Sequence, residues 1–176
     1  MLSNMSESPH EAFVAALVAV APHPDRAERL HLFGQFVGSW DLTVTDHRPG
    51  RETSGTPGEW HFGWLLGGNA VGDVWIYPAR STGQTRVEHG ASVRFPDPDG
   101  DGWRSTWIGP LAGIVRPFIA RPVGDEIILA GSFSDGVETR WVFSDITDDS
   151  FAWRNEERAD GESTWRLLQT FAAVRR

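Results

Sequence analysis

The stretch that decides the fold is FGQFVGSWDLTVTD, residues 33–46, because the spacing of its apolar residues changes within it. Up to Val37 the apolar residues recur at the helical spacing of about 3.6 residues, and from Gly38 onward the period becomes 2. A period of 2 is typical of a strand with one buried face. We therefore predict an N-terminal helical segment, residues 1–37, followed by an all-β body, residues 38–176.

The β pattern continues to the C-terminus, with turn signals such as Gly67-Gly68-Asn69, Asp135-Gly136 and Asp160-Gly161 between the strands. The predicted strands cover 38–46, 58–66, 70–78, 86–95, 103–109, 113–121, 126–133, 137–145, 151–158 and 163–174. No helical pattern separates them, which excludes parallel crossovers and favours an antiparallel meander. We expect the meander to close into a barrel, because closure removes exposed edge strands and leaves room for one small ligand.

The N-terminal segment carries two helix patterns and an apolar run that is similar to part of a secretory signal. The run AFVAALVAVA, residues 12–21, has no arginine before it, whereas a signal requires a basic stretch there. We therefore expect a cytoplasmic protein in which this run forms a helix of about 12 residues, capped by Ser6 or Ser8 and ended by Pro22. A second helix is predicted over 24–36, and the two helices should pack on the body as a cap.

Composition and charge exclude several functional classes. The 176 residues amount to one domain, and no stretch approaches the 18 or so unbroken apolar residues of a membrane span. The formal net charge of −8 disfavours nucleic acid as a partner, because an acidic surface repels phosphates. Cysteine is absent and all 16 basic residues are arginine, which excludes thiolate chemistry and lysine Schiff bases.

Several segments resemble a known class of barrel. Gly38-Ser39-Trp40 resembles the Gly-x-Trp opening of lipocalin-like (calycin) barrels, in which the tryptophan plugs the closed end. Similarity to an uncharacterised bacterial family of such barrels is carried by EWHF (59–62), LGGNA (66–70), SFAWRNE (150–156) and DGESTW (160–165). The resemblance covers about residues 32–176. It implies a ten-stranded, antiparallel, up-and-down barrel with an N-terminal helical cap, and it implies no reaction.

Patterns for metals and cofactors are incomplete. The stretch DPDGDG, residues 97–102, matches the first half of a calcium loop, but Ile108 stands at the twelfth position, where a glutamate should close the coordination sphere. We interpret it as an acidic hairpin tip. No two histidines have ligand spacing, and none follows His89 to serve as the late-strand ligand of haem barrels. The Arg-x-Tyr clamp of fatty-acid-binding barrels is also missing, so we expect no metal and no cofactor.

Residues 59–77 are the richest candidate for a binding site. The side chains that share a strand face are Trp60, Phe62 and Trp64 on the first strand and Asp73, Trp75 and Tyr77 on the next. A hairpin loop of two or four residues would place both sets on one face, whereas a loop of three would place His61 opposite Trp75. A slip of one residue exchanges inside for outside, so the sequence leaves the inner face open.

We interpret the aromatic face as the wall of a cavity for a small apolar or aromatic molecule, with plain core filling as the alternative. Trp107, Arg140 and Trp153 on later strands complete the candidate ligand-binding set. Burial would raise the pKa of an inward Asp73 unless a cation such as Arg140 or Arg154 paired with it. A mid-strand arginine more often points out into solvent, and the alternative is an inward side chain that pairs with Asp73 or with a ligand anion.

Three functions are compatible with this pattern. The first is binding of the small molecule. The second is a cofactor-free isomerase or cyclase that works in the same cavity by substrate positioning and proton transfer, with Asp73 and His61 as candidate catalytic residues. The third is a structural or regulatory homodimer without a ligand. Leu65, Val74 and Ile76 on the other sheet face need a cover, so we also predict a homodimer through this face or the N-terminal helix lying across it.

Overall fold

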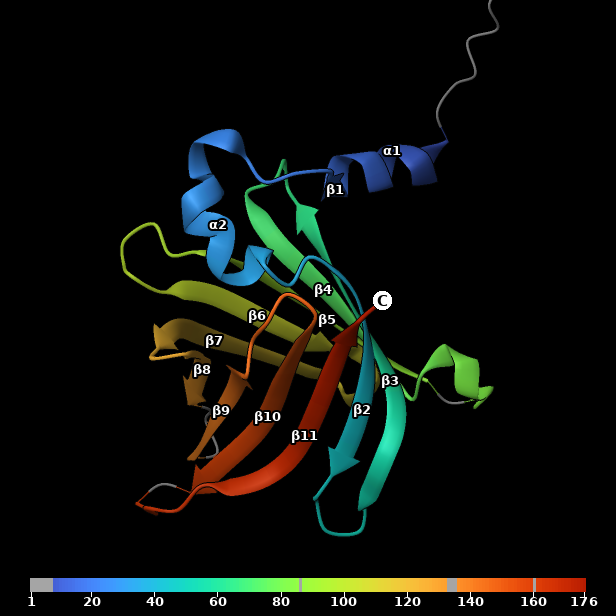
Figure 1. The fold of residues 1–176 in the computed structure, drawn as a ribbon, viewed down its shortest axis with the longest axis vertical. Helices are drawn as coiled ribbons and strands as arrows, with labels where there is room; N and C mark the ends of the chain where they lie inside the picture. The colour runs from blue at the N-terminus through green and yellow to red at the C-terminus, as the bar shows by residue number, and fades with distance from the viewer. Residues whose placement is uncertain (1–7, 86, 133–135, 160) are drawn as a thin grey trace, which may run out of the picture.

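In the computed structural model, which describes residues 8–85, 87–132, 136–159 and 161–176, the chain forms a barrel of antiparallel strands with two short α-helices at one end (Figure 1). The described residues contain ten long strands, namely β2 (Gly38–Asp46), β3 (Thr53–Leu65), β4 (Ala70–Tyr77), β5 (Glu88–Pro96), β6 (Trp103–Gly109), β7 (Ile114–Val123), β8 (Glu126–Ser132), β9 (Val137–Ser144), β10 (Ser150–Ala159) and β11 (Arg166–Arg175). The predicted turn residues Asp135 and Asp160, the strand ends at 86 and 133, and Ser6 lie outside the described residues.

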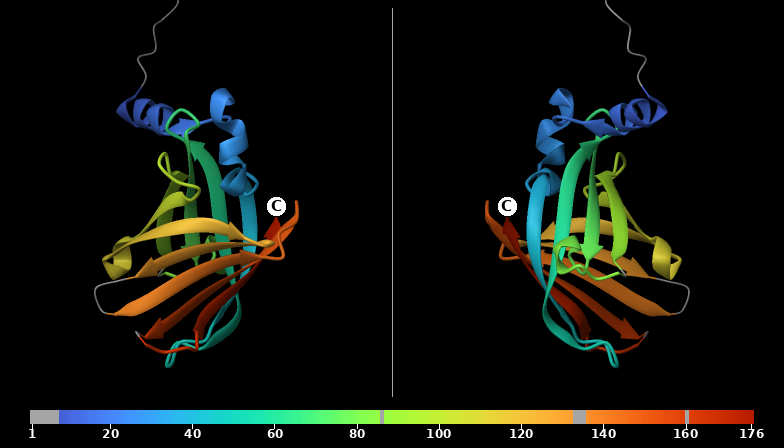
Figure 2. Two further views of the ribbon diagram at one scale, coloured as in Figure 1. Left: turned by 90° about the vertical axis from the view of Figure 1, so that its left-hand side faces the viewer. Right: turned by 90° about the vertical axis from the view of Figure 1, so that its right-hand side faces the viewer.

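Strand pairing closes the sheet completely. Each strand from β4 to β11 pairs antiparallel with the next one, β11 pairs with β2, and β3 pairs with both β2 and β4. Figure 2 shows the closed wall from two sides, with the helices at one end. The predicted closed, ten-stranded, up-and-down antiparallel barrel is confirmed. Short turns place each strand beside the next one. With no helix to cover the two edge strands, their backbone N–H and C=O groups find partners when the edges pair with each other.

The register of β3 on β4 determines the inner face. Trp60 lies opposite Trp75 and Leu65 opposite Ala70, so the turn contains the four residues 66–69. The two aromatic sets therefore share the inner face, and His61 lies on the outer face. A Cβ at Gly68 would lie 2.4 Å from the carbonyl oxygen of Ala21, so only glycine permits the N-terminal segment to cross this turn.

The N-terminal segment forms α1 (Pro9–Leu17), β1 (Val18–Ala19), the 3₁₀ turn η1 (Pro24–Arg26) and α2 (Ala27–Gly34). Ser8 caps α1 by accepting from the backbone N–H of Glu11. The helix ends before Pro22 because β1 becomes extended and pairs with the end of β3. Short 3₁₀ turns η2 (Arg80–Thr82) and η3 (Pro110–Ala112) lie between strands. No helix in the described part of the chain is long and apolar enough to cross a membrane.

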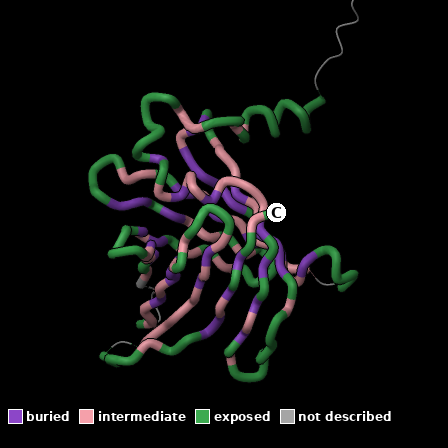
Figure 3. Tube along the Cα trace, in the orientation of Figure 1, coloured by how far each residue is buried: buried purple, intermediate pink, exposed green. Residues whose placement is uncertain are grey.

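The two helices differ in how they meet the barrel. Helix α1 buries none of its side chains and projects beyond the barrel, exposed along its length (Figure 3). Helix α2 instead buries Leu30 and Phe33, and Phe33 packs edge-on against Trp103 at a ring distance of 5.0 Å. Of the predicted two-helix cap, α2 is therefore the part that enters the core, where it plugs one end of the barrel.

Trp40 occupies the same closed end. Its side chain is fully buried, and its indole N–H donates to the carbonyl of Phe36 at 2.7 Å. The ring of Phe151 lies 4.7 Å away, and the Phe36 ring joins both to the plug. With this end filled by aromatic side chains, space for a ligand is left toward the opposite end.

Candidate ligand cavity

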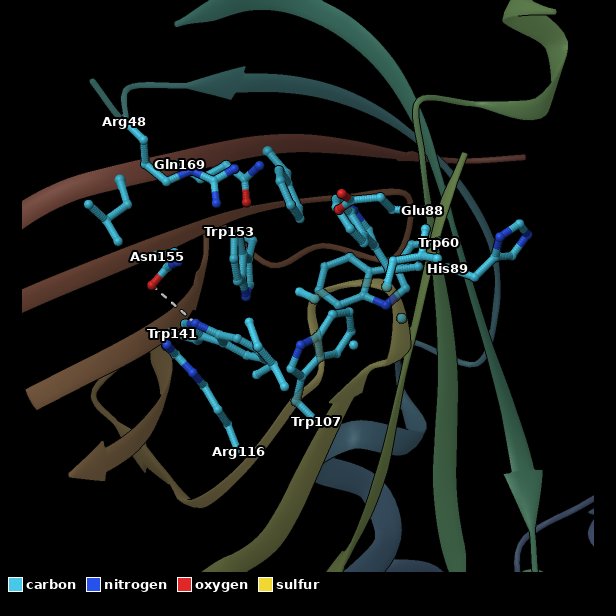
Figure 4. A pocket seen from close by; sticks show the side chains of 18 of the residues that line it. Arg48, Trp60, Glu88, His89, Trp107, Arg116, Trp141, Trp153, Asn155 and Gln169 are labelled. Carbon is cyan, nitrogen blue, oxygen red and sulfur yellow. Dashed lines mark hydrogen bonds between the residues drawn. The ribbon is translucent and has the colours of Figure 1, made fainter. Parts of the chain in front are cut away.

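The barrel contains a cavity of about 400 Å³ toward the end opposite α2 (Figure 4). Two groups of residues line it. The aromatic wall consists of Trp60, Trp75, Trp107, Trp141, Trp153 and Phe171. The polar residues include Arg48, Arg51, Glu88, Arg116, Asn155, Glu157 and Gln169. A volume of 300 to 1,000 Å³ is usual for small-molecule sites in proteins.

Five of these aromatic side chains form a closed ring, which we call the aromatic girdle. The distances between neighbouring ring centroids are 6.0 Å from Trp75 to Trp107, 5.6 Å from Trp107 to Trp141, 5.5 Å from Trp141 to Trp153, 4.2 Å from Trp153 to Phe171, and 5.9 Å from Phe171 back to Trp75. The rings come from β4, β6, β9, β10 and β11, each from an inward position. Aromatic pairs in such contact contribute about 1 kcal/mol each beyond their burial, so the girdle supports its own shape.

Gly90 makes room for one member of the girdle. It lies on β5 opposite Trp75, and a Cβ placed on it would be 1.8 Å from the Trp107 ring. The six-membered part of the Trp107 indole therefore lies directly over the β5 backbone. Any side chain at position 90 has to displace that ring.

Beneath the girdle, Trp60 connects the cavity to a buried ion pair. Trp60 packs against Trp153 at 6.0 Å, and its indole N–H donates to the Asp73 carboxylate at 2.7 Å. The same carboxylate pairs with Arg94, whose guanidinium is fully buried and also donates to Ser92 at 3.1 Å. Burial lowers the pKa of Arg94 to about 9, which leaves it protonated at neutral pH. Asp73 therefore faces inward but lies below the cavity, held by two donors.

Neither of the two candidate arginines pairs with Asp73. Arg140 and Arg154 both lie on the outer face, where Arg140 donates to Glu156 at 2.6 Å and Arg154 to Glu126 at 2.9 Å. Arg94 takes their place because it occupies an inward position of β5, the strand that pairs with β4. The alternation of 88–95 was the signal for this residue, and the sequence reasoning missed it.

Three covered donor atoms of residues that line the cavity have no hydrogen-bond acceptor among the described residues. They are the buried indole nitrogens of Trp75 and Trp153 and the amide nitrogen of Gln169. Other indoles of the core are satisfied, since Trp60 donates to Asp73 and Trp141 donates to Asn155 at 3.1 Å. Buried donors in folded proteins nearly always have a partner.

The mouth of the cavity carries charges of both signs. Arg48 pairs with Asp46, and Glu157 pairs with Arg166. Arg51, Glu88 and further polar groups also line the cavity. The close view in Figure 4 shows the ring of His89 pointing away from the enclosed space, as its outward position on β5 requires. The mouth is therefore a polar rim above an aromatic interior.

The structure brings together four of the predicted ligand-binding residues and separates the others from them. Trp60, Trp75, Trp107 and Trp153 line the cavity. Phe62 lies nearer the plug, where its ring is 5.7 Å from that of Phe36. Trp64 is displaced in the same direction, with its ring against Gly34 of α2. Both residues face inward, but at a level that the plug already fills.

Tyr77 and Arg140 also stand outside the lining of the cavity. Tyr77 stacks on Trp75 at 5.4 Å, and its hydroxyl lies 3.3 Å from that of Thr53. Arg140 lies on the outer face of β9, over the ring of Trp165 at 4.2 Å. Its outward direction follows from the alternation that points Trp141 inward.

His61 belongs to a polar cluster on the outer face. Its Nδ1 lies 2.9 Å from the Ser39 hydroxyl and its Nε2 lies 3.2 Å from Glu59. Hydrogen bonds from Arg80 lower the pKa of Glu59 to about 2. The sequence left the face of His61 open, and the four-residue turn puts this residue on the other side of the sheet from Trp75.

The lining residues that the sequence did not identify include Trp141, Phe171 and Gln169. Trp141 and Phe171 alternate with outward residues on β9 and β11, and this alternation is a signal that identifies them as inward. Gln169 carries no such signal. A polar residue at an inward position gives the same sequence pattern as a strand whose register is shifted by one residue. In the described part of the chain, no cluster of three His, Asp or Glu side chains is placed to hold a metal ion.

Comparison with known proteins identifies a similar fold among solved structures. No known protein family matches the chain, and no curated protein does. Among solved structures, the chain is similar to the S-type phycobiliprotein lyase CPES from Guillardia theta, with a TM-score of 0.51 and 12% identity over 83% of this chain and 91% of that one. At this identity the likeness concerns the fold alone. The chain has a lipocalin-like barrel fold, as the motifs around Trp40 led us to expect.

Proposed function

We propose that this protein binds a small, flat, largely apolar molecule in the cavity, against the aromatic girdle. The observation that carries the proposal is a cavity of about 400 Å³ whose wall includes five aromatic side chains in mutual contact. A solid core would fill this space, as the plug does at the other end. Flat rings that stack on the indoles would gain both burial and aromatic contact.

The polar rim supports binding from solution. A ligand enters between charged residues that keep the mouth hydrated, and it reaches apolar surface only inside. The rim has both signs of charge, with Arg51 and Glu88 as examples. Specificity for the ligand therefore depends on the side chains of the cavity wall more than on the net charge of the ligand.

The isomerase or cyclase alternative is less well supported. Its two candidate proton-transfer residues do not line the cavity, since Asp73 is held by Arg94 and Trp60 and His61 lies on the outer face. The homodimer stays a prediction. Val74 on the outer face of β4 is 40% exposed and α1 buries no side chain, and light scattering of the full chain tests the prediction.

Titration with two rigid probes, fluorene and 9-fluorenone, tests the binding function. We expect saturable binding of at least one probe at a single site, measured by equilibrium dialysis. Gly90→Ala, which has to displace the Trp107 ring, should weaken binding about tenfold. The matched control is Gly63→Ala on β3, where an added Cβ meets no atom within 4 Å. Equal loss in both variants, or no binding of either probe to the wild-type protein, would contradict the proposal.

A further inference from the structure

The outer face of the barrel carries a serine, a histidine and a glutamate that are joined in a row by hydrogen bonds. We propose that Ser39 is a nucleophile for acyl transfer, with His61 as its general base and Glu59 as the residue that positions the imidazole. The three side chains lie on the opposite face of the barrel wall from the aromatic girdle. This activity therefore goes beyond the proposed binding function and does not depend on it.

The register of β2 on β3 brings the three side chains together. Ser39 lies directly opposite His61 in the antiparallel pair, and Glu59 stands two residues before His61, so all three share one face. The Ser39 hydroxyl lies 2.9 Å from Nδ1 of the imidazole, and the Glu59 carboxylate lies 3.2 Å from its Nε2. A nucleophile, a base and a carboxylate that orients the base are the groups that serine acyl transfer requires, at these distances.

The charge on Glu59 determines which nitrogen of the imidazole acts as the base. The hydrogen bonds from Arg80 hold the pKa of Glu59 at about 2, so its carboxylate is ionised at neutral pH and only accepts hydrogen bonds. Nε2 of His61 therefore carries the proton that it donates to Glu59. The Arg80 guanidinium also approaches Nε2, but at 3.5 Å it is farther away than the carboxylate. Nδ1 is left with a lone pair, and this lone pair accepts from the Ser39 hydroxyl in the direction that proton transfer needs.

The site is accessible from solvent. The His61 side chain is 28% exposed, and Ser39 is half-buried. Gly63 is the next outward position on β3, and a Cβ placed on it would meet no atom within 4 Å, so the surface beside the imidazole is open. On the other side of Ser39, the backbone N–H of Arg176 donates to the Ser39 carbonyl at 2.9 Å, and the Arg176 guanidinium adds a positive charge to this face. Positive charge favours the oxyanion that forms when an acyl carbon is attacked.

The proposed reaction is the hydrolysis of a small ester in two steps. The Ser39 oxygen attacks the ester carbonyl carbon, its proton passes to Nδ1 of His61, and the alcohol leaves with that proton. Water then attacks the acyl-serine with the help of the same base, which releases the carboxylic acid and restores the hydroxyl. A small ester is the expected class, because an open sheet face offers little surface for a long acyl chain.

The first experiment determines the tautomer of His61 by nitrogen NMR of the full chain, with His61→Gln used to identify the signal. We expect the proton on Nε2. Glu59→Gln should weaken this preference, because a neutral amide can either donate or accept. The control Glu28→Gln, at an exposed position of α2, should leave it unchanged. A proton on Nδ1 would overturn the proposal, since the imidazole would then donate to Ser39 instead of accepting its proton.

The second experiment measures covalent labelling by a fluorophosphonate, in which the serine oxygen bonds to phosphorus and fluoride leaves. We expect an adduct on Ser39, located by peptide mass spectrometry, and slow hydrolysis of p-nitrophenyl acetate by the same protein. Ser39→Ala should abolish both, and His61→Gln should slow both by at least about 100-fold, the usual contribution of a general base.

The matched control is His31→Gln, which removes an exposed histidine of α2 and should react like the wild type. Circular dichroism checks that each variant is folded, and His61→Gln carries the test if Ser39→Ala is not. Labelling of Ser39 at the same rate as the other serines, or unchanged labelling in His61→Gln, would show that the row is only a structural hydrogen-bond network and would overturn the proposal. Neither result would affect ligand binding in the cavity.

Discussion

The guanidinium of Arg175 lies 4.1 Å above the ring of Trp40, so that the last strand of the barrel covers the tryptophan of β2. The same guanidinium donates to the carbonyls of Val37 and Gln35, both at 2.9 Å. These contacts join β11 to the segment that connects α2 with β2. Arg175 therefore links the closing strand of the barrel to the plug.

Replacing Arg175 with glutamine should lower the free energy of unfolding by about 2 kcal/mol, because a cation–π contact and two hydrogen bonds from a charged group are lost. Urea denaturation measures the change. The adjacent Arg176→Gln is the control, since its side chain is 40% exposed and its ion pairs with Asp41 and, at 3.4 Å, with Glu59 should contribute less than about 1 kcal/mol. Similar effects of the two substitutions would show that Arg175 does not stabilise the closed end.

Replacing Asp73 with asparagine should destabilise the protein by about 3 to 5 kcal/mol, because Arg94 is left buried without its counter-charge. The double variant Asp73→Leu/Arg94→Met removes both charges and should recover much of the loss. Thermal and urea unfolding of the three proteins give the comparison. A single variant as stable as the wild type would mean that the pair does not hold the base of the cavity.

The pH dependence of stability should include a contribution from Glu59. Its pKa is lowered to about 2, chiefly by hydrogen bonds from Arg80, so the folded state favours the charged form. This stabilisation is present above the unfolded pKa of about 4.5 and is lost as the pH falls toward 2. Glu59→Gln should be less stable at pH 6 and should lose less stability on acidification. Glu28→Gln, at an exposed position of α2, should follow the wild-type curve.

The difference between the two helices predicts opposite effects for two phenylalanines. Phe33→Ala in α2 removes a fully buried ring from the plug and should cost about 3 to 5 kcal/mol in the free energy of unfolding. Phe13→Ala in α1, at a side chain that is 64% exposed, should change it by less than about 0.5 kcal/mol. A large effect at Phe13 in the monomeric protein would contradict the exposed position of α1.

The sequence by itself determined the barrel. The change of period at Gly38 and the turn signals placed nearly every strand, since alternation and turn chemistry are local properties that each segment carries. Closure followed as well, because a helix-free meander has no other way to pair its edges. The sequence also predicted that Trp60 and Trp75 share one face of the sheet, but only for a turn of two or four residues.

Tertiary structure alone decided the register, the depth of each inward side chain and the ion-pair partners. Trp60 and Trp64 lie on the same face, yet one reaches the cavity and the other packs under α2, because the plug occupies one end. Asp73 pairs with Arg94 across two strands, although the two residues are 21 positions apart. The girdle also depends on contacts between strands, since its five rings come from five different strands. Distances between strands depend on stagger and closure of the whole sheet, which no local pattern encodes.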